Sequence, residues 1–147
     1  MIFVTNAESE FANLKKPHIL YLITMTKNLD SFCKIGITRQ TLQNRFKNYL
    51  AEGYVIEIKK VLYMDGYKAR GIESMLLERG LDFLQKKQFA MGTRLQGYTE
   101  TYQIEYLPTI FGVFNFLQNN LPKKTSEKFK KIFHQNNSTQ LQINFPE

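Results

Sequence analysis

The sequence predicts an α+β fold, in which a small three-stranded antiparallel or mixed sheet is flanked by helices and followed by a helical C-terminal extension. Three β-favouring runs lie in the first half of the chain, and amphipathic helical patterns separate and follow them. A chain of 147 residues with 43% apolar residues has the size and composition of one compact domain. We therefore expect one domain over residues 17–106 and an extension, 107–147, that packs on it or is partly disordered.

The first two strands are predicted to form a hairpin. Residues 19–25 are a continuous β-favouring run, and residues 32–38 are a second run rich in branched side chains. The polar segment 26–30 separates the two runs. The sequence therefore predicts two antiparallel neighbours with the connection at 26–30.

A helix is predicted after the hairpin, and a third strand after the helix. The helix covers residues 41–51 and ends before Gly53, a helix-stop signal. Its apolar positions repeat at helical spacing: Leu42, Phe46, Tyr49 and Leu50. The strand covers residues 54–64, alternates only in part, and is closed by the predicted turn Asp65-Gly66.

A second helix is predicted over residues 68–88, and it contains an unexpected acid. At about 100° per residue, Glu73 falls near the middle of the face that carries the apolar residues. These are Ala69, Ile72, Leu76, Gly80, Phe83 and Leu84. A carboxylate turned toward a core loses several kcal/mol of hydration unless a partner replaces the water. The partner is either a cation such as Arg45, in a structural ion pair, or a divalent metal ion.

These residues together resemble the GIY-YIG nucleases, most closely the phage and mobile-element branch whose second signature reads Lys-Ile-Gly. Leu20-Tyr21-Leu22 corresponds to the first signature, and Lys34-Ile35-Gly36-Ile37-Thr38 to the second. The resemblance spans residues 19–102, where order and spacing carry more weight than any single motif.

Three further positions match the family. Arg45 corresponds to the arginine of the first helix, Tyr49 to the Tyr or His one turn later, and Glu73 to the metal-binding glutamate. The segment 97–102, Gly-Tyr-Thr-Glu-Thr-Tyr, resembles the strand that closes the domain in that branch.

The resemblance implies a nuclease that hydrolyses DNA with one divalent cation, Mg²⁺ or Mn²⁺. It implies that Tyr21 acts as the general base or orients that base, and that Arg45 binds the phosphate oxygens in the transition state. It also implies that Glu73 holds the metal ion and that Tyr49 positions phosphate or water. Cutting both strands would require a transient dimer on DNA or two successive events.

Lys34 departs from the second tyrosine that many family members carry. An ammonium group cannot serve as a phenolate base, although it can bind phosphate or lower the pKa of Tyr21. A third alternative is that the chain keeps the fold as a catalytically inactive nucleic-acid-binding module.

The extension is predicted to contain a short apolar helix over residues 110–117, followed by a basic amphipathic helix. Five lysines of this second helix are DNA-binding candidates: Lys123, Lys124, Lys128, Lys130 and Lys131. The helix either lies along a DNA backbone or packs its aromatic residues on the domain and leaves its lysines in water. A net charge of +7 favours a polyanionic partner.

Other classes of protein are disfavoured by composition. The single Cys33 cannot form an internal disulfide and is expected to be a small buried residue. We find no secretory pattern at the N-terminus and no apolar run near the ~18 residues that a membrane helix needs. We expect a soluble intracellular protein of the cytoplasm or a host cell, or of the nucleus in a eukaryotic or viral setting, with no membrane partner.

Overall fold

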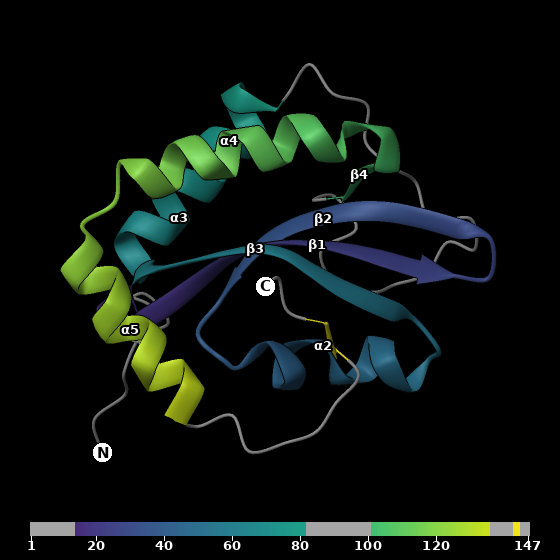
Figure 1. Cartoon of the computed structure of the whole chain (residues 1–147), viewed down its shortest axis with the longest axis horizontal. Helices are drawn as coiled ribbons and strands as arrows, with labels where there is room; N and C mark the ends of the chain where they lie inside the picture. Colours follow the sequence, from purple (N-terminus) through teal and green to yellow (C-terminus); the bar gives the residue numbers. More distant parts are fainter. Residues whose placement is uncertain (1–13, 82–100, 136–142, 145–147) are drawn as a thin grey trace, which may run out of the picture.

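The computed structural model describes residues 14–81, 101–135 and 143–144, without the side chains of residues 79, 80, 135, 143 and 144. The fold is α+β, as predicted: one sheet lies between two layers of helices (Figure 1). No helix among the described residues is long and apolar enough to cross a membrane.

The sheet has three long strands, as predicted, and two short edge strands that extend it. The strand order is β4-β2-β1-β3-β5. The strands are β1 (Pro17–Lys27), β2 (Asp30–Thr38), β3 (Val55–Asp65), β4 (Thr101–Gln103) and β5 (Ile143–Asn144). All neighbours are antiparallel except β3 and β5. The prediction of a three-stranded sheet was therefore incomplete. The edge strand β4 overlaps the segment 97–102, which the resemblance assigned to a closing strand, and residues 97–100 lie outside the described residues.

The central strand β1 is buried on both of its faces. Every residue from Ile19 to Met25 is buried. Successive side chains of a strand point to opposite faces, so such a strand needs a covering layer on each side. Helices α2 (Leu42–Ala51) and α5 (Lys123–Gln135) pack on one face, and α3 (Gly66–Met75) and α4 (Leu107–Asn119) pack on the other (Figure 1).

The connection in the β1–β2 hairpin is tighter than predicted. Only Asn28 and Leu29 lie between the strands, and Asn28 adopts a left-handed φ of 58° that asparagine tolerates. Thr26 and Ser31, expected in or beside the loop, pair across the strands through their hydroxyl groups at 2.8 Å. The two strands thus extend through these polar residues, which were expected to end them.

A bulge at Lys59 explains the broken alternation of the third strand. Leu22 of β1 faces Lys60, whereas the next residue, Ile23, faces Ile58, so Lys59 is the extra residue. The bulge keeps Ile58 and Val61 on the same face although they are three positions apart.

The structure confirms the predicted limits of α2. The Thr41 side chain accepts a hydrogen bond from the Asn44 N–H and caps the first turn. After the helix, Gly53 has a φ of 94°, a conformation that favours glycine.

The second predicted helix begins earlier than expected. The Asp65 side chain accepts a hydrogen bond from the Lys68 N–H at 2.9 Å, so Asp65-Gly66 starts α3 and is not a separate turn. A π-helical turn, Leu76–Gly80, continues α3. Residues 82–88 of the predicted helix lie outside the described residues.

The C-terminal extension contributes to both sides of the core. After a 3-10 turn, Ile104–Tyr106, helix α4 buries Ile110 and Phe114 on one face of the sheet. Helix α5 buries Phe133 on the other face. Both predicted helices are confirmed, and the extension packs on the sheet.

Two of the phenylalanines of α4 provide a direct test of this packing. Phe114 has no exposed surface, whereas Phe116 is 67% exposed on the same helix. We expect Phe114→Ala to lower the free energy of unfolding by about 3 kcal/mol or more, and Phe116→Ala to change it by less than about 1 kcal/mol. Chemical denaturation of the two variants measures the difference, and equal effects would contradict the packing of α4 on the sheet.

Candidate functional site

Tyr21 and Gly36, from the two signature segments, form one contact across the β1–β2 hairpin. The two residues are direct partners in the strand register. A Cβ atom on Gly36 would overlap the Tyr21 Oη and lie 2.6 Å from its Cζ. The phenol therefore lies directly over the Gly36 backbone, and only glycine leaves room for it.

Helix α2 covers Tyr21 and carries the two other residues predicted on this side. The Phe46 ring meets the Tyr21 ring edge-on, with 5.0 Å between centroids. Tyr49 is 3% exposed and packs against Phe46, whereas Arg45 is half-buried with its guanidinium carbon 5.7 Å from the Phe46 ring centroid. Tyr49 is thus a core residue, and Arg45 keeps a partly exposed cation on the flank of α2.

Lys34 lies on the same face of the sheet as Tyr21 and is fully buried. Its direct partners are Ile23 on β1 and Thr101 on β4, so Tyr21 is a diagonal neighbour across the hairpin. Because Lys34 has no exposed surface, it offers none to a DNA phosphate. Two roles were considered for Lys34, phosphate binding and a change in the pKa of Tyr21. The strand register favours the second role, because it places Lys34 diagonally across from Tyr21.

Glu73 is placed differently from the other predicted site residues. It lies on α3, which packs through Ala69 on the face of the sheet opposite Tyr21. Glu73 is half-buried and lies between the buried residues Ala69 and Leu76 in the sequence of this helical segment. The prediction that Glu73 lies in the middle of an apolar face was therefore only approximate. Tyr21, Lys34 and Tyr49 lie on one face of the sheet, and Glu73 lies on the helical layer of the other face.

Glu73 is the predicted ligand for a metal ion. Among the described residues there is no group of three or more His, Cys, Asp or Glu side chains that could hold a metal. Mg²⁺ often uses one or two carboxylates and completes its shell with substrate phosphate and water. Glu73, half-buried and therefore still partly accessible, is compatible with that mode of binding.

The basic helix α5 is anchored to β3 through Tyr63. The Ser126 hydroxyl donates to the Tyr63 carbonyl at 3.2 Å, and the Tyr63 Oη lies 3.3 Å from the His134 Nε2. The Tyr63 ring packs on Phe133. Burial, with a smaller contribution from Glu127, raises the pKa of Tyr63 to about 12.

This anchoring leaves the lysines of α5 exposed to solvent. All five DNA-binding candidates are exposed: Lys123, Lys124, Lys128, Lys130 and Lys131. The alternative in which the aromatic residues pack on the domain is thus confirmed, and it is compatible with lysines that contact DNA.

A pocket of about 660 Å³ lies between β3, α4 and α5 and adds cations that the sequence analysis missed. Its lining includes Lys59 and Lys60 together with Lys123 and Lys130, and Glu127 is the carboxylate among the lining residues. The bulge of β3 brings Lys59 and Lys60 into this lining, and a bulge has no clear sequence signal.

Cys33 is fully buried, as predicted, and plays no part in the candidate site. Its Sγ lies 3.8 Å from the Gln103 carbonyl oxygen, and burial raises the pKa of the thiol to about 12. A neutral, inaccessible thiol is neither a nucleophile nor a ready metal ligand.

Comparisons with known proteins neither support nor contradict the resemblance to the GIY-YIG nucleases. No protein-family model, curated protein or solved structure matches the chain.

The contact between Tyr21 and Gly36 predicts a specific stability effect. We expect Gly36→Ala to lower the free energy of unfolding by about 1–3 kcal/mol or more, because the new methyl group collides with a buried ring. Gly112→Ala is the matched control, since a Cβ there meets nothing within 4 Å and alanine favours the helix. Thermal or chemical denaturation measures both, and a Gly36→Ala protein as stable as the wild type would contradict the contact.

Proposed function

We propose that the chain is a metal-dependent DNA endonuclease of the GIY-YIG type. The observation that carries this proposal is the contact of Tyr21 with Gly36, because it joins the tyrosine of the first signature and the glycine of the second into one unit. The order of elements supports it: a hairpin, a helix with Arg45, a third strand beside β1 and a helix with Glu73.

The reaction requires groups from both helical layers to meet, which restricts where it can occur. Side chains on opposite faces of a sheet can share a site only at an edge or at a strand end. The described part of β4 pairs with β2 only from Phe32 to Lys34, and α3 contacts both β1 and β2. We therefore assign the site to the end of β2 near Gly36 and Thr38.

In the proposed reaction each group has one task. Glu73 would hold the divalent cation, which supplies charge stabilisation for the leaving oxygen when it is bound. Arg45 would donate hydrogen bonds from its planar guanidinium to the non-bridging phosphate oxygens. Tyr21 would orient or deprotonate the attacking water, and the ammonium of Lys34 on the same face would favour its ionised form.

A nucleic-acid-binding module without turnover is the second candidate. The burial of Tyr21 favours it, since a phenol with no exposed surface does not contact water or substrate in this conformation. Both candidates use the exposed lysines of α5, so binding alone does not separate them.

Nicking of supercoiled plasmid DNA with Mg²⁺ or Mn²⁺ separates the two candidates. We expect the wild type to nick, Glu73→Gln to lose the activity, and Arg45→Ala to lose about 10²-fold in rate. Glu78→Gln is the matched control, because Glu78 is an exposed acid on the following turn. No nicking by the wild type together with a normal gel shift would favour the binding module, and a rate unchanged by Glu73→Gln would refute the metal site.

The lysines of α5 should affect binding and not chemistry. We expect Lys131→Ala to weaken DNA binding most at low salt and to lower the slope of log Kd against log salt concentration by about 0.9 if it neutralises one phosphate. The rate at saturating DNA should not change. Fluorescence anisotropy over a salt series measures the slope, and an unchanged slope would remove Lys131 from the interface.

A further inference from the structure

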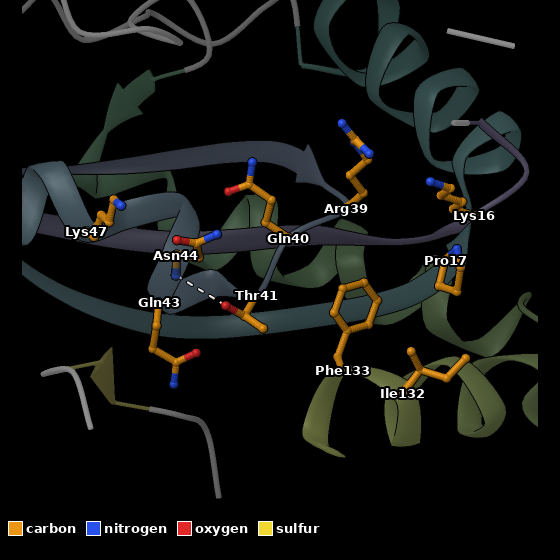
Figure 2. Close-up of a pocket in the computed structure, with 10 residues that line it drawn as sticks. All are labelled: Lys16, Pro17, Arg39, Gln40, Thr41, Gln43, Asn44, Lys47, Ile132 and Phe133. Carbon is orange, nitrogen blue, oxygen red and sulfur yellow. Dashed lines mark hydrogen bonds between the residues drawn. The ribbon is translucent and has the colours of Figure 1, made fainter. Parts of the chain in front are cut away.

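A second pocket, of about 850 Å³, lies at the start of α2 and on the other flank of α5 from the pocket near β3. Figure 2 shows Lys16, Arg39 and Lys47 on the side formed by the sheet and α2, and Ile132 and Phe133 on the side formed by α5. The lining that the structure describes contains these three cations and no carboxylate. The pocket is therefore suited to an anion.

The cations reach the pocket from three separate segments. Lys16 precedes β1 and Arg39 follows β2, and the antiparallel pairing of Ile19 with Thr38 brings these two chain positions to the same end of the sheet. Lys47 comes from α2. Neither Lys16 nor Lys47 has an ion pair within the described part of the chain. A bound anion would therefore give the Lys16 and Lys47 ammonium groups an opposite charge.

Gln43 gives independent support for a ligand. Its side chain lines the pocket, the residue is only 6% exposed, and its carboxamide makes no hydrogen bond to the described residues. The amide atoms are not fully buried, so the amide N–H groups can donate to an oxygen atom of a ligand in the pocket. Gln43 also lies in the first turn of α2, where backbone N–H groups favour anions.

We propose that this pocket binds a backbone phosphate of the DNA whose cleavage is proposed above, so the inference rests on that function. Pro17, in the lining, lies on the same face of β1 as Tyr21 and four residues away, or about 13 Å at the rise of a strand. A DNA strand carries one phosphate per ~3.4 Å of axis, so a strand held near Tyr21 has further phosphates within reach of the pocket. The exposed side chain of Ile132 would then contact sugar.

The test measures binding of a labelled DNA duplex by fluorescence anisotropy in EDTA, so that cleavage does not interfere. We expect Lys16→Ala/Lys47→Ala to weaken binding about 10-fold or more at ~100 mM salt and to lower the salt slope by up to ~2. Gln43→Leu should weaken binding several-fold with the slope unchanged, because no charge is lost. Lys68→Ala, an exposed lysine on the opposite helical layer, is the control and should bind as the wild type does.

Two results would overturn the proposal. Wild-type affinity in the double lysine variant would exclude the pocket from the DNA interface. An unchanged affinity of Gln43→Leu would show that the lysines attract DNA as a basic surface and that the pocket does not bind a phosphate specifically. If a variant does not fold, NMR of the wild-type protein tests the same contact. Addition of DNA should shift the signal of the Gln43 side-chain amide, and an unchanged signal would refute the contact. Inorganic phosphate that displaces DNA at equal phosphate concentration would identify a small-anion site instead.

The same experiments distinguish failure of this proposal from failure of the proposed function. Plasmid that is never nicked, with binding still sensitive to Lys16 and Lys47, refutes the nuclease and keeps the pocket. Nicking that persists, with binding insensitive to both lysines, refutes the pocket alone.

Discussion

The burial of β1 on both faces is the constraint on which the rest of the fold depends. A strand with no exposed residue between Ile19 and Met25 requires a full helical layer on each side of the sheet. The segment up to residue 81 supplies α2 to one face and α3 to the other, and the extension completes the layers with α4 and α5. Residues 107–135 are therefore part of the core. Consequently, the lysines of α5 are held in a fixed position relative to the strands that carry the signature residues.

The same constraint determines how the candidate site can work. Tyr21 and Lys34 belong to the buried layer, whereas Arg45 and Glu73 lie half-buried on helices that cover opposite faces. In the proposed nuclease, the polar groups would meet near the end of β2, and the helices would exclude water from the Tyr21 phenol. Because Tyr21 has no exposed surface, the proposed reaction would require Tyr21 to become accessible, whereas DNA binding through the exposed lysines would not.

Elements with local signals could be predicted from the sequence, and features set by tertiary context could not. The hairpin, α2 and the two helices of the extension follow from apolar runs, Thr41 and Gly53. The dipeptide Asp65-Gly66 is equally typical of a turn and of a helix start, and only the bond from the Lys68 N–H decides between them. The face of Glu73 was extrapolated from a regular helix, whereas the structure has a π-helical turn from Leu76 onward. The pocket at α2 combines lysines and an arginine that are distant in sequence, so no motif marks it.

The lysine of the second signature is the departure with the largest chemical consequence. A tyrosine there could itself lose a proton, whereas a buried ammonium cannot act as a base while it is charged. Lys34 lies on the same face as Tyr21, two residue pairs along the hairpin, and both side chains are buried in a medium of low dielectric constant. In the proposed enzyme, Lys34 would therefore place a fixed charge beside Tyr21 where a second acid–base group could stand.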